Sequence, residues 1–157
     1  MAFHGTLAGN DIILSGAIEP TTKENSVYGV REEDNLNLMT SAGYIYLALE
    51  FEKAYEFALA SMLQKRRTFL ESTIYIFETE TKGMEFYPDY DELGRYEESL
   101  RVAISETKTY AVKDKLLIGT RVNRYKKILV KNYKEACELL DSGKVNDYPW
   151  EILKNSE

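Results

Sequence analysis

The sequence has very few of the residues that form disulfides and metal clusters. It contains one cysteine, Cys137, and one histidine, His4, among 157 residues. A single cysteine has no internal disulfide partner, and one cysteine with one histidine falls short of the ligand set of a zinc site. We therefore expect neither an internal disulfide nor a bound metal.

Long apolar runs are also missing. No stretch approaches the ~18 consecutive apolar residues of a membrane-spanning helix, and no basic segment followed by an apolar one marks a secretion signal. We therefore expect no membrane contact and a cytoplasmic location. Hydrophobic residues make up 44% of the chain and charged residues 29%, which is typical of a folded soluble protein. This length suits one domain over residues 1–157.

Charge is unevenly distributed along the chain. The net charge is −6, yet segment 107–134 holds nine basic residues against one acidic residue, Asp114. That segment therefore carries +8, and the rest of the chain carries −14. Such a basic segment is typical either of a solvated face or of a surface that binds phosphates.

Hydrophobic periodicity predicts a mixture of strands and helices. The clearest helix is 50–63, where apolar residues recur at helical spacing on one face and Phe57 lies off that face. The full prediction is strands over 2–7, 43–49, 69–77, 99–105, 109–112 and 116–122, helices over 10–15, 50–63 and 124–140, and surface loops over 21–42 and 83–96. This order of elements predicts a single α+β domain.

Three short motifs stand in order along the chain. The first is Phe3-His4-Gly5-Thr6, in which an imidazole next to a glycine backbone suits a ribose hydroxyl and an amide group. The second is the strand containing Tyr46, with Phe57 eleven positions later on the following helix. The third is Glu98, at the start of the strand predicted over 99–105.

Together these motifs resemble those of the ADP-ribosyltransferases of the diphtheria-toxin and poly(ADP-ribose) polymerase type. The resemblance implies a compact α+β domain with a split, mostly antiparallel β-core flanked by helices. It also implies NAD as the substrate and no metal. The implied cofactor-binding residues are His4 for the adenosine ribose, the Gly5 backbone for the nicotinamide carboxamide, Tyr46 and Phe57 on either side of the nicotinamide ring, and Thr6 of the first motif.

The implied catalytic residues are Glu98, His4 and Tyr46. Glu98 would bond the nicotinamide-side ribose and stabilise its positive charge. Two residues depart from the pattern: Phe57 replaces a more usual tyrosine, and Ser99 follows Glu98 where an aromatic residue is usual. Glu97 is adjacent, and a slip of one residue turns a strand side chain to the other face. Glu98 is preferred because it shares its side with the alternating apolar residues of the predicted strand.

The resemblance predicts a mono-ADP-ribosyltransferase that modifies a macromolecule, with a protein acceptor favoured over nucleic acid and the oligomeric state open. The small size of the protein suits a toxin or a phage effector. One alternative is an inactive module of the same fold that binds NAD, ADP-ribose or a protein. Another is a nucleic-acid-binding adaptor that uses the basic segment 107–134. RNA 2′-phosphotransferases share an early His-Gly-Thr, but they need a second histidine, which this chain lacks.

Overall fold

The computed structural model describes residues 1–20 and 43–153. Its strands are β1 (Ala2–Thr6), β2 (Ala17–Ile18), β3 (Ile45–Ala48), β4 (Ser72–Thr79), β5 (Thr109–Val112), β6 (Leu116–Leu117), β7 (Val122–Val130) and β8 (Glu151–Ile152). Its helices are α1 (Gly9–Ser15), α2 (Phe51–Gln64), α3 (Tyr90–Leu93), α4 (Leu100–Thr107), α5 (Tyr133–Asp141) and the 3-10 helix η1 (Lys144–Asp147). Among these described helices, none combines the length and the apolar character that crossing a bilayer requires.

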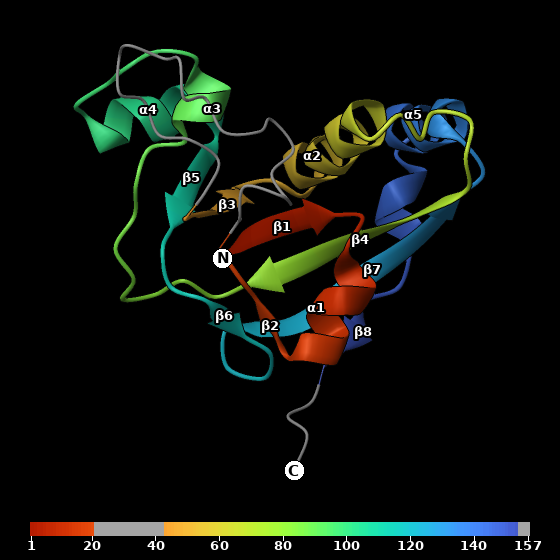
Figure 1. The fold of residues 1–157 in the computed structure, drawn as a ribbon, viewed down its shortest axis with the longest axis horizontal. Helices are drawn as coiled ribbons and strands as arrows, with labels where there is room; N and C mark the ends of the chain where they lie inside the picture. The colour runs from red at the N-terminus through yellow and green to blue at the C-terminus, as the bar shows by residue number, and fades with distance from the viewer. Residues whose placement is uncertain (21–42, 154–157) are drawn as a thin grey trace.

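A six-stranded antiparallel sheet in the order β5-β3-β1-β4-β7-β8 forms the centre of the described structure (Figure 1). Alternate residues of β4 serve the two faces of this sheet. Ile74 and Ile76 pack with α2 and α5 on one face, whereas Tyr75 and Phe77 pack with α1 and with the small β2–β6 sheet on the other. The predicted α+β class, an antiparallel sheet flanked by helices, is confirmed.

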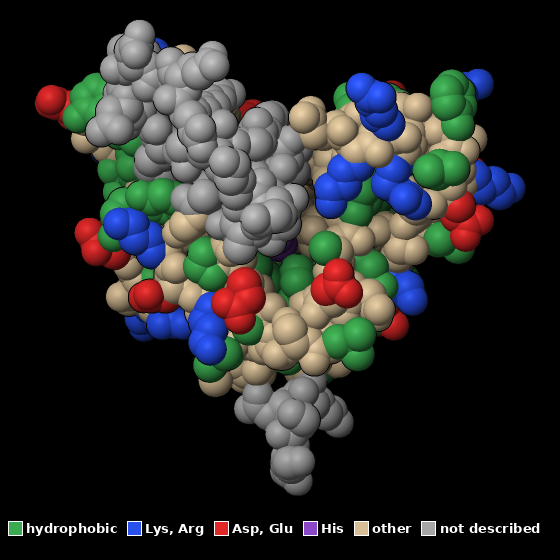
Figure 2. All heavy atoms as spheres, viewed as in Figure 1, with side chains coloured by type: hydrophobic (Ala, Val, Ile, Leu, Met, Phe, Trp, Pro, Cys, Tyr) green, Lys and Arg blue, Asp and Glu red, His purple; other side chains and the backbone are tan. Residues whose placement is uncertain are grey.

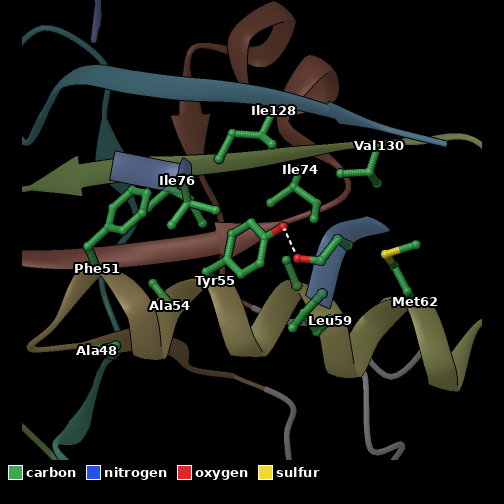
Figure 3. Close-up of a cluster of buried hydrophobic side chains, with 13 residues drawn as sticks. Ala48, Phe51, Ala54, Tyr55, Leu59, Met62, Ile74, Ile76, Ile128 and Val130 are labelled. Carbon is green, nitrogen blue, oxygen red and sulfur yellow. Dashed lines mark hydrogen bonds between the residues drawn. The ribbon is translucent and has the colours of Figure 1, made fainter. Parts of the chain in front are cut away.

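Helix α2 is built as its apolar spacing predicts. Its buried residues are Phe51, Ala54, Tyr55, Ala58, Leu59, Ser61 and Met62, and Figure 3 shows this face against the β4 and β7 side chains. The Tyr55 hydroxyl donates a hydrogen bond of 2.7 Å to the Ala136 carbonyl, which joins α2 to α5. Phe57 lies off the buried face and is only partly covered.

The sheet opens between β1 and β3. Strand β1 pairs with β4 along its whole length, from Ala2 to Thr6. With β3 it has one register pair, Phe3 with Ala48. Beyond that pair the described residues of β1 and β3 have no further register pair. Residues of both strands line a cavity there. This separation is what makes the core split.

The predicted strand over 99–105 is wrong, because these residues form most of α4. The Ser99 hydroxyl accepts a hydrogen bond from the Val102 backbone at 3.2 Å and so begins a helix. Its two buried residues, Ala103 and Thr107, are four positions apart, as on one side of a helix. The apolar residues at 100, 102 and 104 matched a strand period over a run too short to distinguish the two structures.

The predicted helix over 124–140 is also wrong in its first half. Residues up to Val130 belong to β7, in which Lys126, Ile128 and Val130 are buried alternately with exposed neighbours. Asn132 then caps the Glu135 backbone at 2.8 Å, so α5 begins only at residue 133. Within the strand predicted over 116–122, Leu116–Leu117 form β6 and Val122 begins β7, and segment 83–96 contains α3 as well as loop. The loop predicted over 21–42 lies outside the described residues.

Candidate functional site

A cavity of ≈ 380 Å³ occupies the opening between β1 and β3, within the range of about 300–1,000 Å³ that is usual for small-molecule sites. It is lined by His4, Gly5 and Thr6 from β1, Ile45 and Tyr46 from β3, Phe57, Ser61 and Lys65 from α2 and its end, Asp89, Asp91 and Glu92 from the α3 segment, and further residues of α1 and β2. Figure 1 shows α3 and α4 on one side of the molecule and α2 and α5 on the other, and Figure 2, in the same view, shows Lys and Arg side chains over the lobe with α2 and α5.

His4 is held in one tautomer by β3. Its Nδ1 lies 3.1 Å from the Tyr46 carbonyl oxygen, and a carbonyl only accepts, so Nδ1 carries the proton. Burial lowers the pKa of His4, although the bond to the Tyr46 backbone opposes this effect. The ring is therefore neutral at pH 7, and its Nε2 is an acceptor on a side chain that lines the cavity. Such an acceptor suits a hydroxyl group.

Tyr46 is joined to the acidic α3 segment through its phenol. Burial raises the pKa of Tyr46 well above its usual range, and the charges of Asp91 and Asp89 and a side-chain hydrogen bond with Asp91 raise it further. Tyr46 therefore remains a protonated phenol, and its hydroxyl donates to the Asp91 carboxylate. The same residue accepts the His4 bond through its backbone, so Tyr46 connects the two sides of the cavity.

The structure brings Phe57 to the same cavity from α2. Its ring is partly buried, and the Lys53 ammonium lies 5.9 Å from the ring centroid. Lys53 also binds the Glu92 carboxylate at 2.5 Å, which joins α2 to α3. His4, Tyr46 and Phe57 are thus brought together as the sequence predicts, whereas their roles toward NAD stay predictions.

Gly5 and Thr6 line the cavity, and both also have structural roles. A Cβ on Gly5 would lie 1.8 Å from the Ala54 carbonyl oxygen, so the space beside this glycine is filled by the backbone of α2. The Thr6 hydroxyl accepts a hydrogen bond from the Ala8 backbone at 3.0 Å, at the turn that leads into α1. The close approach expected at Gly5 is therefore made by a helix of the same chain.

Glu98 is not brought to this cavity. It lies directly before Ser99, the N-cap of α4, is exposed, and is not among the residues that line the cavity. Glu97 is held elsewhere: one carboxylate oxygen binds Arg95 at 2.8 Å, and the other accepts from the Ser99 backbone at 3.0 Å. Glu97 and Glu98 were considered for the site because a strand was predicted over 99–105, and these residues in fact form most of α4.

The acidic groups of the α3 segment are site residues that the sequence prediction missed. Asp89, Asp91 and Glu92 all line the cavity, from a segment predicted as a surface loop. Asp89 caps α3, and its Oδ1 accepts from the Glu92 backbone at 3.0 Å. An aspartate followed three residues later by a glutamate is the pattern of a capping box, so a helix start was available as a signal.

Asp89 is the most deeply buried of these acids, with 3% of its surface exposed. Burial raises its pKa to about 7, and the nearby charges of Glu92 and Asp91 add to the rise, while hydrogen bonds with the Glu92 backbone and the Thr109 side chain oppose it. The folded-state pKa thus lies above the unfolded value of about 3.9. The protonated form contributes stability that is fully present below pH ~4 and is lost as the pH rises toward 7.

We expect Asp89→Asn to flatten this pH dependence. Asparagine keeps a side-chain acceptor for the α3 cap but carries no charge, so it avoids the cost of ionising a buried group. Urea unfolding at pH 5 and pH 8 should show the wild type losing stability over this interval relative to the variant. Parallel profiles for the two proteins would mean that Asp89 ionises without cost.

Comparisons with known proteins give a likeness of fold. The sequence matches no family model, and no curated protein matches it. Among solved structures, the fold is similar to that of a double mutant of heat-labile enterotoxin, with a TM-score of 0.51 and 14% sequence identity. The similarity covers 100% of this chain and 62% of the enterotoxin chain, so this chain spans less than two thirds of that length. At this identity the likeness shows a toxin-like fold alone.

Proposed function

We propose that this protein is a mono-ADP-ribosyltransferase that cleaves the nicotinamide–ribose bond of NAD and transfers ADP-ribose to a macromolecule, with a protein acceptor favoured. The observation that carries the proposal is that His4, Tyr46 and Phe57 line one cavity. Their motifs are far apart in the sequence and resemble those of one enzyme family. The toxin-like fold supports the same proposal.

The chemistry of the cavity suits NAD. The neutral His4 ring offers an acceptor for a hydroxyl of the adenosine ribose, and Tyr46 and Phe57 offer aromatic surfaces for the nicotinamide ring. An offset aromatic pair contributes about 0.5–1.5 kcal/mol beyond its buried area. Phe57 lacks a hydroxyl, so it would contribute stacking but no hydrogen bond.

The charge of the cavity favours a cation. Among the residues that the structure describes, five carboxyl groups line it, together with one lysine, Lys65, which follows α2; the five are Asp11, Glu19, Asp89, Asp91 and Glu92. The nicotinamide of NAD is a pyridinium, and breaking its bond to ribose places positive charge on the sugar. Negative groups already in position stabilise that developing charge without reorganising at the moment of reaction.

The test is nicotinamide release from NAD by the purified chain. We expect the wild type to release nicotinamide, and His4→Ala to lower kcat/KM about 10-fold or more, because a hydrogen bond worth about 1.4 kcal/mol corresponds to that factor. Phe57→Ala should raise KM several-fold through lost stacking. Phe69→Ala is the matched control, since Phe69 is 92% exposed and does not line the cavity.

Two further results decide between this proposal and an inactive module of the same fold. With labelled NAD and a cell lysate, label on protein supports the favoured acceptor, and label on nucleic acid supports the other. Thermal stabilisation of the chain by NAD with no nicotinamide released would instead identify a binding module. If NAD neither stabilises the chain nor is cleaved to nicotinamide, the proposal is overturned.

The alternative of a nucleic-acid adaptor gains no support from the basic segment. Several of its cations are bound within the protein: Arg124 forms two hydrogen bonds with Glu78, and Arg121 donates to the backbone carbonyls of Glu80 and Lys82. Lys126 is buried, and its ammonium donates to the Asn146 carbonyl at 2.9 Å. These side chains have structural partners and do not form one open surface for phosphates.

A further inference from the structure

A chain of contacts runs through the cavity from β1 to α3. The His4 ring donates to the Tyr46 backbone carbonyl, and the Tyr46 phenol hydrogen-bonds the Asp91 side chain. All three residues line the cavity. Tyr46 of β3 therefore connects the His4 imidazole of β1 with the Asp91 carboxylate of α3.

The other carboxylates around the cavity have different positions or partners. Asp89 uses its Oδ1 to cap α3, and Glu92 is paired with Lys53. Asp11 and Glu19 are exposed, on α1 and directly after β2. Asp91 is the carboxylate joined to the tyrosine that carries the His4 bond.

The position of Asp91 is stabilised from both directions. The α3 helix begins at the Asp89 cap, and the Lys53–Glu92 ion pair holds this helix against α2, the element that carries Phe57. A short helix with one turn has little stability alone. These two contacts keep Asp91 beside Tyr46 before any substrate binds.

From this arrangement we propose that Asp91 is the catalytic carboxylate that stabilises the positive charge on the ribose of NAD, the role that the sequence assigned to Glu98. The proposal rests on the proposed function. In the reaction, the bond between C1′ and the pyridinium nitrogen breaks, and its electron pair leaves with neutral nicotinamide. The acceptor oxygen or nitrogen then bonds to C1′ and gives its proton to solvent water. Asp91 accepts a hydrogen bond from the ribose and places its charge beside C1′ while that carbon is cationic.

The experiment compares nicotinamide release and NAD binding by the full chain with Asp91→Asn and with Glu98→Gln. Removing one group that acts only on the transition state typically costs 10²–10³ in rate. We therefore expect Asp91→Asn to lower kcat about 100-fold, with NAD affinity changed only a few-fold. Glu98→Gln, the matched carboxylate-to-amide control, should remain within about twofold of the wild type, because Glu98 is outside the cavity.

Tyr46→Phe distinguishes two roles of Asp91: acting on the ribose, and holding Tyr46 in position. It removes the phenol that binds Asp91 and keeps the ring. If Asp91 acts on the ribose, Asp91→Asn loses far more rate than Tyr46→Phe. Equal losses, with no further loss in the double variant, would show that Asp91 only positions Tyr46 and would overturn the catalytic assignment.

The remaining outcomes also decide the matter. Full activity of Asp91→Asn in a wild type that releases nicotinamide overturns this assignment alone, and inactivation by Glu98→Gln with Asp91→Asn active returns the role to Glu98. A wild type with no release is a failure of the proposed function itself. Thermal unfolding checks that each variant is folded. If Asp91→Asn is not, Asp91→Ser and Asp91→Glu are compared, and the proposal requires the variant that keeps the charge to be the faster of the two.

Discussion

Replacing Gly5 with alanine is expected to destabilise the protein severely. The new Cβ would lie 1.8 Å from the Ala54 carbonyl oxygen and 2.6 Å from its carbon. Both atoms belong to the backbone of α2, so no side-chain movement relieves the overlap, and the whole helix must shift from β1. We expect a loss of about 4 kcal/mol or more, against a total stability of about 5–15 kcal/mol for a typical domain. Circular dichroism and urea unfolding measure it.

Two further variants make this prediction specific. Gly83→Ala is the matched control: Gly83 has a φ of +82° but no neighbouring atom within 4 Å of the new Cβ, so only backbone strain of about 1–2 kcal/mol is expected. Ala54→Gly in the Gly5→Ala background should restore nothing, because the overlap is with a carbonyl. Near-wild-type stability of Gly5→Ala would contradict the contact between β1 and α2.

Replacing Tyr55 with alanine should produce the second large effect. Its ring is fully buried between α2 and the β4 and β7 side chains (Figure 3), and its hydroxyl donates to Ala136 of α5. Burial raises the pKa of this phenol, so it remains a donor at neutral pH. Deleting a buried aromatic side chain costs about 3–5 kcal/mol, which urea unfolding would show as a lower midpoint.

Tyr55→Phe divides this effect into its two parts. Phenylalanine keeps the ring and removes the hydrogen bond, so a loss of about 1 kcal/mol is expected. Leu63→Ala is the control on the same helix, since Leu63 is 50% exposed and its truncation should cost well under 1 kcal/mol. Similar losses for Tyr55→Ala and Leu63→Ala would contradict the core position of Tyr55.

Several parts of the fold could be predicted because their signals are local. The buried face of α2 follows from residues three and four positions apart, which every helix places on one side. Segments 99–105 and 124–130 could not be predicted in the same way. In both, neighbouring apolar residues are compatible with a strand and with a helix. The Ser99 cap begins a helix in 99–105, whereas contacts distant in the sequence decide the structure of 124–130. Strand β7 pairs with β4 over eight register positions, which stabilises an extended conformation there.

The candidate site shows the same division. His4, Tyr46 and Phe57 were recognised because each lies in a short motif on an element that the sequence predicts correctly. The carboxylate was assigned to Glu98 because a strand was expected there. Three of the acids that line the cavity, Asp89, Asp91 and Glu92, belong to the α3 segment, which was predicted as a surface loop.

By itself, the sequence determined the α+β class, the buried face of α2 and five of the residues that line the cavity, since periodicity and short motifs depend on residues close together in the chain. Only the tertiary structure decided which carboxylates join them. The separation of β1 from β3 creates the cavity, and the Lys53–Glu92 pair brings α3 to its edge. The strand separation and the ion pair both depend on contacts between residues far apart in the chain, and short sequence patterns do not predict which distant residues come into contact.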